Sequence, residues 1–220
     1  VDGNGQTELI EAITGLRKIK DGKIKFLGED ISSLSIKERN DRGLGHIPED
    51  RQKRGLILSF PILYNMVIKD FEKNPFSKKG ILDKEVIRKY SQDIVDKFDV
   101  RSGEGIDSLA GMLSGGNQQK AIIGREVSLD PDLLIAVQPT RGLDVGAIEF
   151  IHEAIVAQRD KGKAVLLVSF ELDEIFNLSD RIAVISGGKL IDIVKTEDTD
   201  VHEVGLMMAG IKKDDKEEVR

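Results

Sequence analysis

The sequence lacks cysteine, contains no long apolar run, and has only three histidines in 220 residues. Without cysteine there can be no disulfide and no thiolate metal site, which fits a reducing compartment. A helix that crosses a bilayer needs about 20 apolar residues in succession, and no run in the sequence approaches that length. The histidines, His46, His152 and His202, fit no metal spacing, so we expect them to be surface or packing residues.

An excess of positive charge is also absent. The formal net charge is −6 at pH 7 and the sequence pI is about 5.3, which disfavours a dedicated nucleic-acid binder. The first residues are glycine-rich and polar and do not resemble a signal peptide. The 220 residues are 40% hydrophobic and suffice for one sizeable core, with a smaller subdomain. We therefore expect a soluble, cytosolic chain.

Strands and helices alternate in the last third of the chain. Residues 133–137 and 163–169 are mainly apolar, which is typical of strands buried on both faces of a sheet. A helix is predicted between them over 145–159. Residues 181–185 and 189–194 flank a Ser-Gly-Gly turn and predict a hairpin. The alternation indicates an α/β fold with a parallel sheet.

Apolar spacing in the first half predicts two amphipathic helices, from Thr7 to Lys18 and from Lys84 to Phe98. A further helix is predicted to begin beyond Gly116. The remaining predicted segments are short strands over 23–27 and 43–47 and a loop over 72–84.

The first candidate site is the stretch Gly3-Asn4-Gly5-Gln6-Thr7, followed by Glu8, at the start of the first predicted helix. A phosphate-binding loop needs glycines that let backbone N–H groups converge on an anion, with a helix N-terminus behind them. It also needs a lysine for the terminal phosphates and a hydroxyl for Mg²⁺. Here Thr7 supplies the hydroxyl, but Gln6 stands where the lysine belongs. The stretch by itself fits a glycine turn that caps an ordinary helix equally well.

The second candidate site is LSGGNQQK, residues 113–120. A small hydroxyl followed by two glycines at a helix start can cradle an anion. A plain helix cap is the alternative. Ser114 would be the donor, and Gly115 and Gly116 would let the backbone approach the anion.

LSGGNQQK resembles the signature of ATP-binding cassette (ABC) proteins. The resemblance implies that the nucleotide-binding residues of this string are Leu113, Ser114, Gly115, Gly116, Asn117 and Gln118. The order of phosphate loop, PEDR segment, signature and PTRGLD resembles an ABC ATPase over essentially the whole chain. The strings GNGQTELIEAITGL, PEDRQKRGL, QPTRGLDVGA and SDRIAVISGGKL look like the second, C-terminal cassette of double-cassette ATPases that drive simple-sugar and nucleoside import. Gln138 together with residues 168–172 (VSFEL) looks most like the nucleoside branch.

This resemblance implies a P-loop NTPase cassette core with a mostly parallel sheet. Residues 1–220 would form a single nucleotide-binding domain, with a helical subdomain at about 62–128 and a charged tail at 212–220. The family's first loop glycine and the strand before it have no counterpart ahead of Gly3, so we expect the chain to be N-terminally truncated.

The resemblance also implies that the catalytic positions have been replaced. The aspartate that holds Mg²⁺ corresponds to Val137, which cannot ligate a metal. The glutamate that activates water corresponds to Gln138, which can orient a water but cannot accept a proton. The switch histidine corresponds to Phe170, whose ring cannot donate a hydrogen bond to the γ-phosphate.

Two further family positions carry charge in this sequence. The glutamine that senses nucleotide corresponds to Glu49, and Arg51 is the candidate to neutralise it; a surface ion pair is the alternative. Asp144 matches an aspartate that the family uses across the dimer interface, and an N-cap is its alternative role. Five family positions of one nucleotide site are therefore replaced in this sequence: Gln6, Glu49, Val137, Gln138 and Phe170. These replacements predict that the site does not hydrolyse ATP and make Mg²⁺ binding there doubtful.

The intact signature would then complete the ATP site of a partner cassette, because cassette dimers sandwich each nucleotide between one phosphate loop and the other signature. The expected partners are the catalytic first cassette of the same protein, transmembrane permease subunits and, indirectly, a substrate-binding protein, but no nucleic acid. The chain would lie on the cytoplasmic face of the membrane. Two alternatives are a weakly active ATPase and a soluble cassette of the translation or DNA-repair type.

Overall fold

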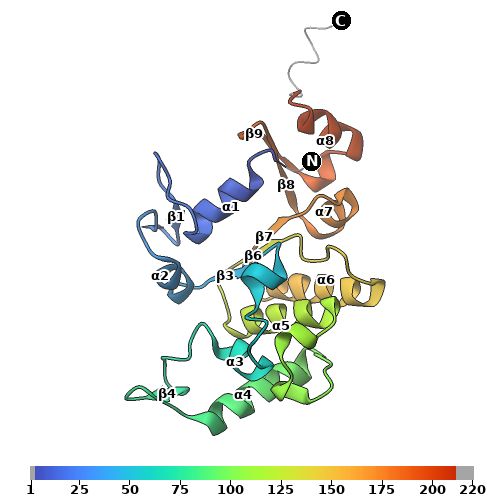
Figure 1. Cartoon of the computed structure of the whole chain (residues 1–220). Helices are drawn as coiled ribbons and strands as arrows, with labels where there is room; N and C mark the ends of the chain where they lie inside the picture. Colours follow the sequence, from blue (N-terminus) through green and yellow to red (C-terminus); the bar gives the residue numbers. More distant parts are fainter. Residues whose placement is uncertain (1–2, 212–220) are drawn as a thin grey trace, which may run out of the picture. The chain divides into compact units, whose positions relative to one another are not determined.

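The computed structural model describes residues 3–211, so the charged tail expected at 212–220 lies outside the described residues (Figure 1). The chain divides into two compact units. One combines the chain ends, residues 1–42 and 167–220, and the other is the continuous segment 43–166. Among residues 3–211, no helix is both long and apolar enough to cross a membrane.

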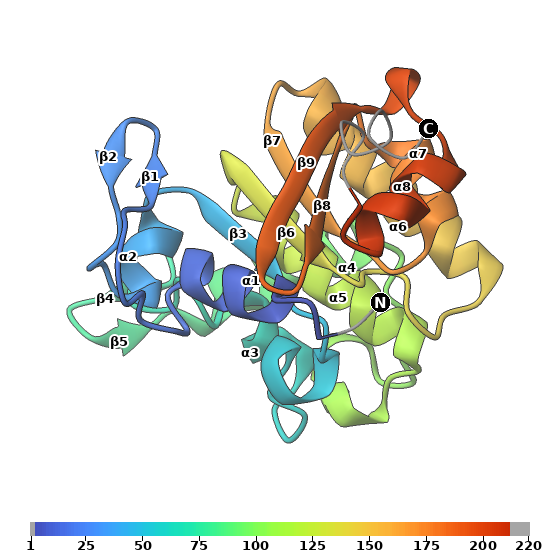
Figure 2. The ribbon, with the colours of Figure 1, turned by 90° about the horizontal axis from the view of Figure 1, so that it is seen from above.

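The unit made from the chain ends is built around an antiparallel hairpin, β8 with β9 (Figure 2). Its core consists of Ile182 and Val184 from β8 and Val204 and Met207 from α8. The elements of this unit are α1 (Gln6–Thr14), β1 (Lys25–Phe26), β2 (Glu29–Asp30), α2 (Ile36–Asp41), α7 (Leu172–Leu178), β8 (Arg181–Ser186), β9 (Lys189–Lys195), a 3₁₀ turn (Thr196–Asp198) and α8 (Val201–Met208).

The continuous unit contains a sheet with the strand order β3-β6-β7. Strands β3 and β6 run parallel, from Leu44 opposite Leu133 to Ile47 opposite Ala136, as the α/β pattern predicted. The elements are β3 (Leu44–Ile47), a π-helical turn (Arg51–Gly55), α3 (Ile62–Val67), β4 (Ser77–Lys78), β5 (Ile81–Leu82), α4 (Lys84–Lys97), 3₁₀ turns (Gly105–Asp107 and Ala110–Met112), α5 (Gly115–Ser128), β6 (Leu133–Val137), α6 (Val145–Asp160) and β7 (Ala164–Val168).

The two apolar runs of the last third differ in burial. The central strand β6 is buried, and Leu134, Ile135 and Ala136 have no exposed surface. The prediction that 163–169 is also a fully buried strand is wrong, because every residue of β7 keeps some exposed surface. The physical reason is its position: within the described residues, β7 is an edge strand with a paired neighbour on one side only.

Two predicted boundaries are corrected by left-handed backbone conformations. Helix α1 ends at Thr14 rather than Lys18, because Gly15 follows it with φ 86° and closes the last turn. The segment 72–84, predicted as a loop, contains the short antiparallel pair β4 and β5. Its turn residues Lys79 and Gly80 have φ 51° and 79°, the positive values that a tight hairpin turn requires.

Helices α3, α4 and α5 pack against one another in the continuous unit (Figure 1). The predicted apolar face of α4 is confirmed, since Ile87 and Ile94 are buried. Gly124 of α5 lies against this face: a Cβ there would lie 2.9 Å from Ile94 Cγ2 and 3.0 Å from the Phe98 ring. The glycine thus lets α5, the helix that carries the signature, pack closely on α4.

A buried charge cluster, which sequence patterns did not predict, fixes α5 to its surroundings. The carboxylate of Glu126 is fully buried and accepts a 2.6 Å bond from Lys69 Nζ, a 3.0 Å bond from Arg125 Nε and a 3.1 Å bond from the His46 main-chain N–H. Burial alone would raise the pKa of Glu126, but the charges of Lys69 and Arg125 outweigh it and lower that pKa. The cluster joins β3 to α5 and to the segment after α3.

Next to this cluster, burial lowers the pKa of the His46 side chain to about 4. Since an unfolded chain protonates this imidazole near its ordinary pKa of about 6.5, the unfolded state binds more protons between these values. Stability should therefore be retained above about pH 6.5 and fall by up to about 3 kcal/mol towards pH 4. His46→Gln should remove this part of the pH dependence in urea unfolding measured at both pH values. If the free energy of unfolding depends on pH in the same way in the variant and the native protein, the lowered pKa of His46 is wrong.

Candidate functional site

The phosphate-loop stretch begins α1 as predicted, and its glycines carry the expected backbone. Gly3 and Gly5 have φ 85° and 105°, and Gly5 is the N-cap residue of α1. The start of α1 lies beside the turn of the β8–β9 hairpin (Figure 2). Asn4 O accepts a 2.8 Å bond from Gly188 N–H, and Asn4 Oδ1 accepts a 3.0 Å bond from Gly187 N–H. A Cβ on Gly5 would lie 3.0 Å from Gly188 Cα, so glycine is required at this contact.

Gln6 interacts with the loop itself. Its side-chain oxygen accepts a 3.1 Å hydrogen bond from the Asn4 main-chain N–H, a donor of the kind that a phosphate oxygen would use. The side chains of Thr7 and Glu8 are exposed. The loop therefore retains the shape of an anion cradle, but it lacks the cation and part of its donor set is satisfied by Gln6.

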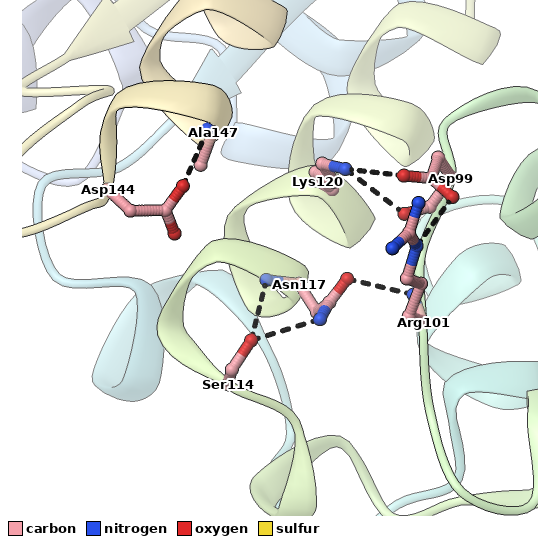
Figure 3. A network of polar contacts seen from close by, with 7 residues as sticks. All are labelled: Asp99, Arg101, Ser114, Asn117, Lys120, Asp144 and Ala147. Atoms are coloured by element: carbon pink, nitrogen blue, oxygen red, sulfur yellow. Dashed lines mark hydrogen bonds and ion pairs between the residues drawn. The ribbon is translucent and has the colours of Figure 1, made fainter.

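The signature forms the first turns of α5, which begins at Gly115 and not beyond Gly116 as predicted. Ser114 is the N-cap residue, and its hydroxyl oxygen accepts hydrogen bonds from Asn117 N at 3.4 Å and from Asn117 Nδ2 at 3.0 Å (Figure 3). Ser114 is exposed, whereas Leu113 is buried. A Cβ on Gly116 would lie 3.4 Å from Ala147 Cβ, so this turn packs against the start of α6.

The polar residues that follow in the signature bind within the chain. Asn117 Oδ1 accepts a 2.8 Å bond from Arg101 N, and Lys120 Nζ forms a 2.9 Å ion pair with Asp99 (Figure 3). Hydrogen bonds from Arg101 and Lys120 hold the pKa of Asp99 below its ordinary value. Gln118 is buried and donates to Ala110 O at 3.1 Å. Asn117 and Gln118, expected to bind nucleotide, thus have structural bonds that hold the turn.

Asp144 caps α6, and its carboxylate accepts a 2.9 Å bond from Ala147 N (Figure 3). The proposed N-cap alternative is therefore observed. The other carboxylate oxygen, Asp144 Oδ2, would lie 3.7 Å from a Cβ built on Gly116. Asp144 therefore borders the signature turn.

The ion pair predicted for Glu49 is corrected. Glu49 bonds not Arg51 but Arg141, whose Nη1 lies 2.5 Å from the Glu49 carboxylate. Arg51 Nη1 instead donates to the main-chain oxygen of Arg141 at 3.0 Å. Both contacts join the PEDR segment to the PTRGLD loop. The physical reason is the turn at Asp50, which caps the π-helical turn and places Arg51 over the signature helix rather than beside Glu49.

The positions matching the family's catalytic residues contain no acid or base. Val137 and Gln138 are buried, and Gln138 has a positive φ of 47°. The Gln138 side-chain Nε2 has no hydrogen-bond partner among the described residues, so this buried donor is left for a water or a ligand. Phe170 is half-buried in the segment between β7 and α7. Within residues 3–211, no group of three or more acidic, histidine or cysteine side chains could hold a metal ion. Neither the aliphatic side chain of Val137 nor the amide of Gln138 offers a carboxylate to a Mg²⁺ ion.

Comparison with known proteins decides the family. The model of the ABC transporter family matches residues 1–141, which include the phosphate loop, the signature and β6. The chain belongs to the ABC transporter family.

This ABC cassette is similar to several curated import proteins. It is 55% identical over 210 residues to the guanosine import ATP-binding protein NupO of Bacillus subtilis, and 51% identical to the nucleoside import ATP-binding protein NupA of Lactococcus lactis. Each match covers 96% of this chain and 41% of the relative. The glucose import ATP-binding protein TsgD13 of Haloferax volcanii is 45% identical over 96% of this chain and 38% of its own length. The cassette thus spans about two-fifths of the length of these relatives.

Solved structures confirm the α/β cassette fold. A nucleotide-free ATP-binding cassette from an ABC transporter has a TM-score of 0.77 at 22% identity, covering 97% of this chain and 86% of that one. A dimeric cassette in a post-hydrolysis state with ADP and Pi has a TM-score of 0.74 at 22% identity, covering 89% and 82%. At this identity the likeness establishes the fold alone.

Proposed function

We propose that this cassette is the second nucleotide-binding domain of an ABC importer for nucleosides or simple sugars, and that nucleosides are the substrate class. Its signature would complete the ATP site of a partner cassette, while its own phosphate loop forms a silent site. The observation that carries this proposal is the intact, exposed start of α5 at Ser114 in a chain whose catalytic positions hold Val137 and Gln138.

The signature turn has the features that a phosphate needs. Ser114 is exposed and caps a helix of 14 residues, so free backbone N–H groups and the positive end of the helix dipole lie at one point. A γ-phosphate brought there by a partner cassette would accept hydrogen bonds from these groups. ATP is the expected nucleotide, and its Mg²⁺ would be held by the partner cassette.

The silent site follows from the chemistry of the replaced residues. Gln6 carries no charge to offset the triphosphate, and its side chain already uses the N–H of Asn4. Gln138 cannot accept a proton from water, so general-base catalysis is lost. We infer that this site binds ATP weakly and does not hydrolyse it.

The partners follow from the relatives. Guanosine and nucleoside import are the activities named for proteins 55% and 51% identical to this chain, and those proteins are more than twice its length. We infer that a catalytic first cassette belongs to the same protein, and that permease subunits hold it at the cytoplasmic face of the membrane. A substrate-binding protein would act through the permease, and no nucleic acid is involved.

The substrate class is tested by uptake in cells. Deleting the full-length protein should abolish uptake of labelled guanosine, and restoring it should recover uptake. Unlabelled nucleosides should compete with this uptake, whereas ribose and glucose should not. If the deletion removes sugar uptake and leaves nucleoside uptake unchanged, the nucleoside assignment is wrong.

A further inference from the structure

Arg51 lies directly on the signature turn. It is the first residue of the π-helical turn, and its guanidinium is held by a 3.0 Å hydrogen bond from Nη1 to Arg141 O. A Cβ built on Gly115 would lie only 2.9 Å from Arg51 Nη2. Glycine at 115 therefore leaves the space that this guanidinium occupies, at the N-terminus of α5.

The positive charge of Arg51 is not neutralised within the described part of the chain. Glu49, the carboxylate expected to pair with it, bonds Arg141 instead. Lys53 of the same turn, by contrast, lies 3.8 Å from the carboxylate of Asp50. Because a helix N-terminus carries about half a positive charge, a cation beside it is unfavourable until an anion arrives.

The hydroxyl of Ser114 supports the same conclusion independently. Its oxygen accepts two hydrogen bonds, both from Asn117, and its own hydrogen has no acceptor among residues 3–211. The site thus combines a free hydroxyl donor and an uncompensated cation. These two groups suit an oxyanion with more than one exposed oxygen.

We propose that Arg51 binds the γ-phosphate of the nucleotide held by the partner cassette and makes the assembled site prefer ATP to ADP. This inference rests on the proposed function, because it assumes that the signature faces a partner's nucleotide. ADP lacks the phosphoryl group that would reach Arg51 and Ser114. The guanidinium therefore adds to the affinity for ATP and not to the affinity for ADP.

The test uses the full-length protein in its importer complex and compares a non-hydrolysable ATP analogue with ADP. Loss of a charge-assisted hydrogen bond should weaken binding of the ATP analogue about tenfold in Arg51→Gln and leave ADP affinity within about twofold. Arg51→Lys should recover most of the affinity for the analogue. Lys53→Gln makes the same change of charge on an exposed side chain of the same turn and should leave both affinities unchanged.

Equal weakening for both nucleotides would mean that Arg51 is only structural, and no weakening would mean that its charge does not reach the phosphate. Either result overturns the inference. The rate of ATP hydrolysis by the Gly115→Glu variant distinguishes a failure of the Arg51 inference from a failure of the proposed function. If Gly115→Glu stops hydrolysis while Arg51→Gln keeps the ATP preference, only the role of Arg51 is wrong. If Gly115→Glu hydrolyses normally, the proposed function itself fails.

Discussion

Gly115→Glu in the full-length protein should lower transport-coupled ATP hydrolysis about 10²–10³-fold, the loss that follows removal of a preorganised group at a developing charge. The new carboxylate would lie at the start of α5, where Gly115 has no room for a side chain without moving Arg51. It would also repel the γ-phosphate. The nearest atom that it displaces is the end of a flexible arginine, so the fold should tolerate the change.

Gly205→Glu is the matched control. Gly205 lies in α8, is exposed, and has no atom within 4 Å of a Cβ position. The same substitution of helical glycine by glutamate should therefore leave hydrolysis close to that of the native protein. The measurement is the ATPase rate of the assembled importer with and without its transported substrate. Equal activity of the Gly115 and Gly205 variants would refute the role given to the signature.

The second large effect concerns this cassette's own site. When the catalytic glutamate of the proposed first cassette is replaced by glutamine, turnover by the full-length protein should fall about 10²–10⁴-fold, the usual contribution of a general base. Neither Gln6 nor Gln138 can compensate, because Gln138 cannot act as a base and Gln6 carries no positive charge. Residual turnover comparable to the native rate would instead favour a weakly active ATPase.

Substitutions at the two positions of the proposed silent site provide the matching control. Gln6→Ala removes a neutral side chain, and Gln138→Ala removes an amide that cannot take up a proton. Each should change hydrolysis by the otherwise native importer by no more than about twofold, since neither removes a base. If Gln6→Ala is more damaging than Gly115→Glu, the roles of the two half-sites are reversed.

Local signals predicted those parts of the molecule in which neighbouring residues decide the structure. The apolar run of β6 fitted a buried central strand, and Ser114 and Asp144 marked the starts of α5 and α6 because their side-chain oxygens accept hydrogen bonds from the next turn. The hairpin at Gly187 followed from its turn residues. These features need only a few consecutive residues, so a sequence can specify them.

Contacts between distant residues were not predictable in the same way. Glu49 and Arg141 are far apart in the chain, and nothing in the PEDR string distinguishes Arg51 from Arg141 as the partner of Glu49. The cluster of His46, Lys69 and Glu126 likewise forms only when β3, the segment after α3, and α5 come together. Charge pairing depends on distances of a few ångströms, which the order of residues does not fix.

The sequence by itself determined the ABC family, and it predicts an intact signature and replaced catalytic positions, because each depends on which side chain occupies a motif position. Only the tertiary structure decided what surrounds the signature. It paired Glu49 with Arg141, left the charge of Arg51 without a carboxylate among the described residues, and placed that charge over Gly115. The physical reason is that a motif specifies chemical groups, whereas the field at a helix N-terminus depends on every charge that the fold brings near it.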